Sequence, residues 1–285
     1  MSLALARRNL ITLMEILACA IANILVFVFG ACIGSFLNVV IYRLPAGLSL
    51  IHPPSRCPKC DHKLGKTENV PVLGWLWLRG RCRWCKTSIS IRYPLVEAAT
   101  GIIFLLVFWH FGYSLQTLGY WAFLSWLLAL SLIDFDTMTL PGSLTKSGLV
   151  LGLIFQIIIG WQTASGKGIA QQLMFGISGA VLGIWLLGTI RIAGSIAFQQ
   201  EAMGVGDEKL MATIGAWLGW KYVLLSSLLA CAVGSIVGGG AMAVGILGKK
   251  QAIPFGPFLA LGGALTLFWG EAILSAYLKF FIVSS

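Results

Sequence analysis

Acidic residues are scarce in this chain. Only ten Asp and Glu occur among 285 residues, against twenty Lys and Arg, and charged residues make up 11% of the sequence. Hydrophobic residues make up 58%, whereas soluble globular domains are about 45–50% apolar. This composition excludes an ordinary soluble domain. Several apolar stretches reach the roughly 20 residues that cross a hydrocarbon core, so the sequence predicts a polytopic membrane protein.

Further absences narrow the class of protein. The sequence has no internal repeat, no low-complexity tract and no glycine-rich nucleotide-binding loop after a strand. The first apolar run, about 14–42, is too long for a secretory signal peptide, and no small-residue cleavage site precedes a soluble domain. We therefore expect the apolar runs to be membrane spans of the protein itself.

Apolar length, helix breakers and loop charge predict an all-α polytopic membrane protein with about eight transmembrane helices. The expected spans cover about 17–42, 94–112, 117–134, 145–162, 169–195, 222–247 and 255–282, together with a sixth span that starts near Asp207. The apolar part of that sixth span ends early, at Trp217. The loop charges fit an arrangement with both termini outside. Gly30/Gly34 and Gly234/Gly238 have the four-residue spacing that allows close helix packing.

Half of the basic residues lie in one segment, 43–92. This segment has ten Lys and Arg but only two acids, Asp61 and Glu68. Basic residues concentrate in the cytoplasmic loops of membrane proteins and set their orientation. That orientation signal explains the net charge of +10 without a nucleic-acid site. We therefore expect a cytoplasmic segment and no nucleic-acid partner.

Four of the seven cysteines form a pattern that is typical of a metal site. They make two Cys-x-x-Cys pairs separated by 21 residues, Cys57/Cys60 and Cys82/Cys85. Each pair offers two thiolates on one turn, and two pairs complete a tetrahedron around zinc. Nearby Lys and Arg favour the thiolate form. All four ligands are protein atoms, so we expect a structural zinc that holds together a segment too small for its own core.

Other interpretations of the cysteine segment stay open. A rubredoxin-like iron site or a redox-active dithiol would use similar pairs of cysteines. His52 and His62 lie near the pairs and could also be ligands, although solvated loop histidines are the simpler interpretation.

Two acidic residues lie at the ends of apolar runs, where a carboxylate is costly and is a candidate for function. Asp134 closes the third expected span and Asp207 opens the sixth. Alternation of the spans puts both on the cytoplasmic side, so side chains 73 residues apart can meet. Two close carboxylates push their pKa values apart, so that one is ionised and one is protonated. Such a pair can activate a water molecule for peptide hydrolysis and protonate the carbonyl oxygen.

We expect the acidic neighbours of the two aspartates to lie outside the site. Asp136 is about 200° around a helix from Asp134, so we expect it in the loop or in solvent. Glu208 is likewise expected to point outward. The glycines of Gly204-Val-Gly206 permit unusual backbone conformations and leave room for a substrate strand. A simpler alternative is that Asp207 only stabilises the positive N-terminus of its helix.

Several motifs occur in a fixed order along the chain. They are Gly34-Ser-Phe-Leu-Asn38, the two Cys-x-x-Cys pairs, Ile89-Ser-Ile-Arg92-Tyr-Pro94-Leu-Val-Glu97, Ile133-Asp134-Phe-Asp136 with Leu140-Pro141, Gly204-Val-Gly-Asp207-Glu-Lys209-Leu, Gly215-Ala-Trp-Leu-Gly219-Trp and Ile253-Pro-Phe-Gly-Pro257. In combination they resemble the bacterial type IV prepilin leader peptidase/N-methyltransferases, which are membrane aspartyl proteases of the Gly-x-Gly-Asp type. The resemblance extends from about residue 30 to about residue 262.

The resemblance implies a multi-pass enzyme of the bacterial cytoplasmic (inner) membrane with two activities. Such enzymes cleave the leader from prepilins and pseudopilins at the cytoplasmic face, and then methylate the new N-terminus with S-adenosylmethionine. By position, the two catalytic aspartates are Asp134 and Asp207. The cysteine tetrad of the family falls on Cys57, Cys60, Cys82 and Cys85. The expected partners are prepilins or pseudopilins and the lipid bilayer.

We expect three parts in such a chain. Residues 1–45 would hold the N-terminal segment and the first transmembrane helix, 46–93 the cytoplasmic zinc module, and 94–285 the multi-helix membrane peptidase domain. Arg92 and Glu97 are motif residues that would serve as interface anchors or as contacts for substrate or methyl transfer.

Two other functions would use some of the same residues. A related intramembrane aspartyl protease would use both aspartates, with peptidase activity only or with a different substrate. A transporter would use buried acids to carry protons or cations, but it would leave the four cysteines unexplained.

Overall fold

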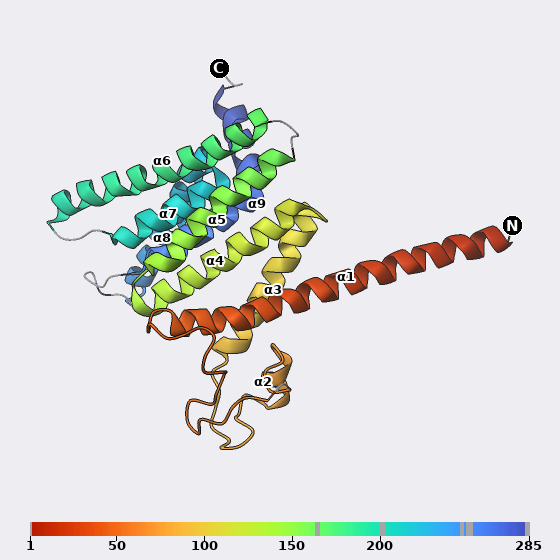
Figure 1. Cartoon of the computed structure of the whole chain (residues 1–285). Helices are drawn as coiled ribbons and strands as arrows, with labels where there is room; N and C mark the ends of the chain where they lie inside the picture. Colours follow the sequence, from red (N-terminus) through yellow and green to blue (C-terminus); the bar gives the residue numbers. More distant parts are fainter. Residues whose placement is uncertain are drawn as a thin grey trace. The chain divides into compact units, whose positions relative to one another are not determined.

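The computed structural model describes residues 2–65, 67–162, 166–199, 203–245, 248 and 253–282. These ranges contain nine α-helices and no β-sheet, so the predicted all-α fold is confirmed. The helices are α1 (Ser2–Arg43), α2 (Leu73–Trp77), α3 (Arg92–Phe111), α4 (Leu115–Thr137), α5 (Gly142–Trp161), α6 (Gly166–Phe198), α7 (Val205–Leu218), α8 (Trp220–Ala243) and α9 (Gly256–Ile282) (Figure 1). They belong to two compact units, Met1–Thr117 and Leu118–Ser285.

Within the described ranges, seven helices are long and apolar enough to cross a membrane: α1, α3, α4, α5, α6, α8 and α9. This is one fewer than the expected eight, because the sixth expected span is the 14-residue helix α7. Such a helix is about 21 Å long, shorter than a hydrocarbon core of about 30 Å. It ends at Gly219, which has a φ of 82° and lies against the ring of Phe175. A side chain at position 219 would clash with that ring, so glycine permits the sharp turn into α8.

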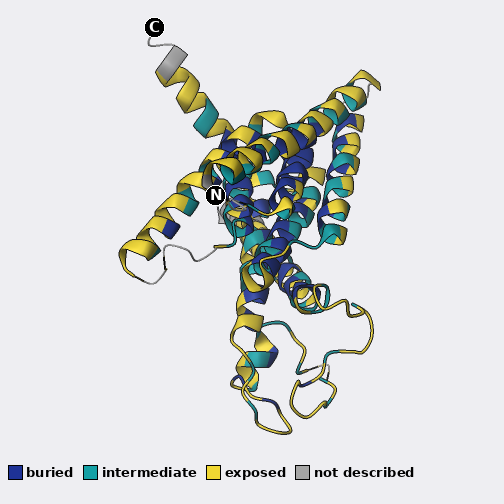
Figure 2. Ribbon diagram, turned by 90° about the vertical axis from the view of Figure 1, so that its left-hand side faces the viewer, coloured by how far each residue is buried: buried dark blue, intermediate teal, exposed yellow. Residues whose placement is uncertain are grey.

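Residues 210–218 of helix α7 are all buried. Buried residues, dark blue in Figure 2, gather where the helices pack against one another. The ring of Trp217 stacks between Phe123 of α4 and Phe155 of α5, with centroid distances of 5.3 and 5.0 Å. Its indole N–H donates to the carbonyl oxygen of Gly148 at 2.8 Å. α7 is therefore the central helix of this unit, and the outer helices enclose it.

Two kinds of contact fix the position of α7. Against α6, the backbones meet directly, since a Cβ atom on Gly215 would lie 2.2 Å from the carbonyl oxygen of Gly179. Against α5, the side-chain amide of Gln156 donates to the carbonyl oxygens of Ala216 and Trp217, at 3.1 and 2.8 Å. Carbonyl groups at the C-terminus of a helix have no partner within that helix, so Gln156 caps α7.

The first unit is built on the pairing of α1 with α3. A Cβ atom on Gly34 would lie 2.7 Å from the Cα atom of Glu97, and one on Gly30 would lie 2.9 Å from the Cα atom of Gly101. The predicted close packing at the two α1 glycines is therefore confirmed. At Gly234 and Gly238 of α8, a Cβ atom would instead meet the side chains of Phe258 and Ile253, at 3.4 and 3.3 Å. The indole of Trp109 adds a hydrogen bond across the same pair of helices.

We predict that Gly215→Ala lowers the stability of the protein, because its Cβ atom would overlap the Gly179 carbonyl oxygen. Overpacking of this kind costs about 1–3 kcal/mol, more than the roughly 0.5–1 kcal/mol that alanine gains over glycine within a helix. Gly239→Ala in α8 is the matched control, because no atom lies within 4 Å of its Cβ position. Thermal unfolding of the purified variants measures the difference, and equal melting temperatures would contradict the packing.

Candidate active site and metal centre

Asp134 lies in the last turn of α4 and is buried. Its Oδ2 atom accepts a hydrogen bond from the backbone N–H of Gly256, at 2.9 Å. Gly256 is the first residue of α9, so the carboxylate faces the positive end of the α9 dipole. A helix that begins 122 residues later in the chain thus holds one oxygen of this side chain in place.

The sequence predicts no role for Gly256, but the structure gives it one. A Cβ atom at this position would lie 2.6 Å from Oδ2 of Asp134 and 3.2 Å from its Cβ atom. Only glycine therefore lets the N-terminus of α9 approach the carboxylate so closely. The available signal is Pro257, because proline is typical of the first turn of a helix and marks its start.

Asp207 lies in the first turn of α7 and is also buried. Burial and, after it, the negative charge of Asp134 raise the pKa of the Asp207 carboxyl to about 7, against the lowering effect of a backbone hydrogen bond from Gly204. These surroundings therefore favour the protonated form of the Asp207 carboxyl. The effect of one charge on the other means that the two carboxylates lie within electrostatic reach.

The two aspartates come together because several helix ends meet. The C-terminal end of α4 carries Asp134, and the N-terminal ends of α7 and α9 carry Asp207 and Gly256. The segment that follows α4 also contacts α7, since a Cβ atom on Gly206 would lie 2.9 Å from the Cβ atom of Leu140. One end of the second unit thus holds two buried acids with different surroundings.

Glu208 does not point outward, so that expectation is wrong. Its side chain is buried, with 9% of the residue exposed, and its Oε1 atom accepts a hydrogen bond from Nε of Arg191 on α6 at 2.5 Å. The reason is that α7 is enclosed on several sides, so both acids of its first turn face other helices. The carboxylate lies beside Gly188 of α6, where a Cβ atom would be at an ordinary contact distance of 3.7 Å.

The other neighbours of the aspartates lie as follows. Asp136 is exposed, as predicted from its angle to Asp134 around the helix. The glycines of the Gly204-Val-Gly206 motif do not adopt a positive φ. The sequence suggested that these glycines leave room for a substrate strand. In the structure, the space beside Gly206 is occupied by the side chain of Leu140. The glycine requirement at this position therefore comes from the packing of the segment after α4.

Four cysteine side chains converge in the segment between α1 and α3. Their sulfur atoms all lie within 4.8 Å of one another, with Sγ–Sγ distances of 3.7 Å for Cys57 and Cys85 and 3.9 Å for Cys60 and Cys82. A metal with four thiolates at about 2.3 Å in a tetrahedron has sulfur atoms about 3.8 Å apart. The four side chains therefore have the spacing of a tetrahedral metal site.

Each cysteine pair stands on the same local turn. The carbonyl oxygens of Cys57 and Cys82 accept hydrogen bonds from the N–H groups of Asp61 and Lys86, both at 3.0 Å. Asp61 and Lys86 also have the same left-handed conformation, with φ values of 53° and 58°. The site thus consists of two matching turns that face each other.

The surroundings of the thiols favour metal binding. Backbone hydrogen bonds from Lys59 and Cys60 lower the pKa of Cys57 to about 6. A backbone hydrogen bond from His62 favours the Cys60 thiolate, but burial and the other thiols outweigh it and raise the pKa of Cys60 to about 12. These hydrogen bonds therefore favour the thiolate of Cys57, and Cys60 would release its proton to a bound metal.

Neither histidine of the segment belongs to the cluster of possible ligands. Among the described residues, that cluster contains the four cysteines alone. The ring of His62 packs against the indole of Trp84, with centroids 4.5 Å apart, and His52 is exposed. The interpretation of both as loop histidines fits these positions.

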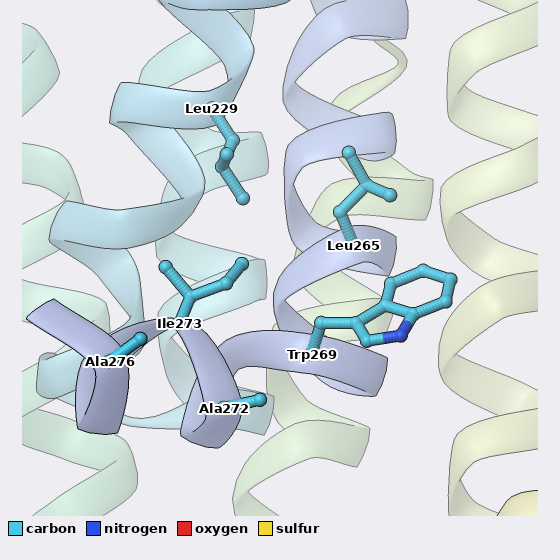
Figure 3. Close-up of a pocket in the computed structure, with 6 residues that line it drawn as sticks. All are labelled: Leu229, Leu265, Trp269, Ala272, Ile273 and Ala276. Carbon is cyan, nitrogen blue, oxygen red and sulfur yellow. The ribbon is translucent and has the colours of Figure 1, made fainter.

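A separate depression of about 380 Å³ lies between α8 and α9. Its lining residues, shown in Figure 3, are all apolar: Leu229, Leu265, Trp269, Ala272, Ile273 and Ala276. A surface of this kind suits lipid chains. Hydrolysis needs groups that transfer protons, so the candidate chemistry belongs to the two aspartates.

We predict that Cys82→Ser removes the bound metal, because a tetrahedral thiolate site needs all four ligands. Cys231→Ser is the matched control, since Cys231 lies on α8 and outside the cluster. Elemental analysis of the purified proteins should find about one metal ion per chain in the wild type and the control, and almost none in Cys82→Ser. Wild-type protein without any metal, purified in the absence of chelators, would contradict the assignment.

The chain matches two protein-family models. Residues 28–111 match the bacterial peptidase A24 N-terminal domain, and residues 121–239 match the type IV leader peptidase family. No solved structure matches the chain.

Relatives match over most of their length. A prepilin leader peptidase/N-methyltransferase of Stutzerimonas stutzeri is 40% identical over 277 residues, which cover 89% of this chain and 92% of the relative. Proteins of the same name from Aeromonas hydrophila and Legionella pneumophila are 38% and 34% identical, and the matches cover 90% and 91% of this chain and 94% and 95% of the relatives. The expected resemblance is therefore confirmed, and the chain belongs to the type IV leader peptidase family.

Proposed function

We propose that this protein cleaves the leader peptide of type IV prepilins or pseudopilins with Asp134 and Asp207, and then methylates the new N-terminus. The observation that carries the proposal is the convergence of these two buried carboxylates at one end of the second unit. The names and the extent of the matching relatives support the substrate and both activities.

The surroundings of the two acids support different roles. Asp134 accepts a backbone hydrogen bond at the positive end of α9, an interaction that suits a carboxylate. Asp207, with its raised pKa, suits the member of the pair that holds a proton. We therefore assign Asp134 as the general base and Asp207 as the general acid.

Hydrolysis with these roles balances protons without a further group. Asp134 takes a proton from a water molecule, whose oxygen bonds to the scissile carbonyl carbon, while Asp207 gives its proton to the carbonyl oxygen. When the tetrahedral intermediate collapses, the C–N bond breaks and the leaving amine takes the proton from Asp134. Asp207 then recovers a proton from the hydroxyl group as the carbonyl forms again. General acid–base steps of this kind contribute roughly 10²–10⁴-fold each to the rate.

We infer that the metal of the four-cysteine site is a structural zinc ion. Four thiolates in a tetrahedron are a common zinc ligand set, and they leave no open position for water or substrate. Zinc would therefore hold the two matching turns together and would take no part in hydrolysis.

S-adenosylmethionine is proposed as the methyl donor because the relatives carry the name N-methyltransferase. The helices and turns of the described residues offer no glycine-rich loop after a strand to receive it. We therefore assign no residue to methyl transfer.

We propose the bacterial inner membrane as the location. Seven apolar helices support a multi-pass membrane protein. The excess of Lys and Arg between residues 43 and 92 supports a cytoplasmic position for the cysteine segment. Cleavage would then take place at the cytoplasmic face, where prepilin leaders are expected.

We predict that Asp134→Asn and Asp207→Asn each reduce leader cleavage by roughly 10²-fold or more, because each removes a proton-transfer group. Asp136→Asn is the matched control and should keep normal cleavage, since this exposed residue is only two positions from Asp134. Mass spectrometry of a prepilin incubated with each purified variant measures loss of the leader. Normal cleavage by either site variant would rule out the carboxylate pair.

We predict that cleavage declines as the pH rises above about 7, because Asp207 then loses the proton that it must donate. Two charges among the described residues act on it, Asp134 on α4 and its own neighbour Glu208, and both raise its pKa. Glu208 is paired in turn with Arg191 on α6. Glu208→Gln removes that charge and leaves Arg191 uncompensated, so the pKa of Asp207 falls and the decline begins at lower pH.

The pH dependence of the cleavage rate, measured for the wild type and for Glu208→Gln, tests this effect. Glu271→Gln on α9 is the matched control, because Glu271 neighbours Tyr222 rather than Asp207. An unchanged profile in Glu208→Gln, or a shift to higher pH, would contradict the assignment of Asp207 as the acid.

A further inference from the structure

The short helix α2 exposes an apolar face. Leu73, Leu76 and Trp77 have exposed fractions of 63%, 55% and 88%. Their positions i, i+3 and i+4 put them on the same side of the helix. Three large apolar side chains that project together from a small segment are the kind of surface that normally contacts a partner or a membrane.

The opposite face of α2 is attached to the cysteine segment. Gly74 is buried, and the indole N–H of Trp75 donates to the carbonyl oxygen of Ile89 at 3.0 Å. Gly80 packs against the same indole, since a Cβ atom there would lie 2.6 Å from the ring. The inner face of α2 is thus already used, and only the face of Leu73, Leu76 and Trp77 remains available.

A hydrogen bond sets the depth of α2 along the membrane helices. The N–H of Val72, immediately before α2, donates to Oε2 of Glu97 at 2.7 Å. Glu97 is five residues after Arg92, the start of α3, so it lies about 7.5 Å along the helix axis. α3 has 20 residues, about the minimum that crosses a bilayer. The segment before α2 therefore lies beside the first turns of a membrane span, at the depth of the bilayer surface.

The backbone at this attachment is strained. Val72 has φ and ψ values of 62° and −54°, and the N–H of Leu73 donates to the carbonyl oxygen of Pro71 at 2.6 Å. This is a tight γ-turn of the rare, strained form, at a β-branched residue that avoids positive φ. Such a conformation persists where its surroundings enforce it. The carboxylate of Glu97 supplies that constraint and directs the chain into α2.

Basic residues follow α2 directly. Arg79, Arg81, Arg83 and Lys86 are all exposed. Basic residues at a membrane surface attract anionic lipid headgroups. Tryptophan is also enriched at the boundary between headgroups and acyl chains. A basic prepilin leader would be repelled by the same charges, so a lipid surface fits this part of the protein better.

We propose that α2 is an interfacial anchor, which places Leu73, Leu76 and Trp77 among the lipid acyl chains and Arg79 and Arg81 at anionic headgroups. The anchor would hold the cysteine segment against the membrane surface at a fixed depth. This inference depends on the membrane helices and on Glu97, and it does not depend on the peptidase activity.

Photo-crosslinking of the full-length protein in lipid nanodiscs tests the anchor. Benzoyl-phenylalanine replaces Trp77 in one variant and Trp84 in another, and mass spectrometry identifies the adducts. Trp84 is the matched control, because it is 65% exposed but lies on a cysteine turn against His62. We expect several-fold more lipid adduct from position 77 than from position 84.

Two further comparisons test the cause of the contact. Nanodiscs of phosphatidylcholine with phosphatidylglycerol should give more adduct at position 77 than phosphatidylcholine alone, and Arg79→Ser with Arg81→Ser should remove that preference. Glu97→Ala should reduce the adduct by releasing Val72. Metal content, measured in every variant, verifies that the cysteine segment is still folded.

The proposal would be overturned by equal lipid adducts at positions 77 and 84. It would also be overturned by adducts to an added prepilin, or to a second copy of the chain, in place of lipid. Because the readout is a lipid adduct, the anchor can fail while leader cleavage is normal, and it can hold in a variant that lacks cleavage.

Discussion

The enclosure of α7 is the constraint on which the second unit depends. α7 is short, and aromatic rings from α4 and α5 and the glycine backbone of α6 surround it. A polar group in such a position needs a partner, because burial without one costs free energy. Gln156 therefore caps the C-terminal carbonyl groups of α7, and Arg191 pairs with Glu208 at the other end. Asp207, by contrast, has a pKa that is raised chiefly by burial.

The difference between the two aspartates follows from the helix ends that meet them. Asp134 receives an N–H group at the start of α9, and Gly256 is the residue that lets this backbone come close enough. Asp207 lies at the start of α7, where burial dominates. The two side chains thus have different surroundings. The carboxylates themselves do not determine this difference, since it comes from the packing of backbone around them.

The sequence predicts much of the fold and the residues of both sites. Long apolar runs gave seven of the spans, and spacing alone identified the four cysteines. The sixth span was wrong because a 14-residue buried helix has the same apolar composition as part of a span. Glu208 was assigned to solvent for a related reason, since periodicity does not reveal that a helix is enclosed on several sides. The role of Gly256 depends on contact between residues 122 apart, which no local pattern contains.

The glycine contact between α6 and α7 has a mechanical consequence. Where Gly179 meets Gly215, backbone touches backbone, and no flexible side chain lies between them to absorb a displacement. These two helices should therefore move as one rigid body. The contact of α7 with α9 is different. The side-chain ends of Ile214 on α7 and Leu127 on α4 would lie 3.3 and 3.4 Å from a Cβ atom on Gly263 of α9. If the second unit opens to admit a polypeptide, α4 and α9 should therefore move relative to the α6–α7 pair. The Asp134–Gly256 hydrogen bond joins these same two helices, α4 and α9.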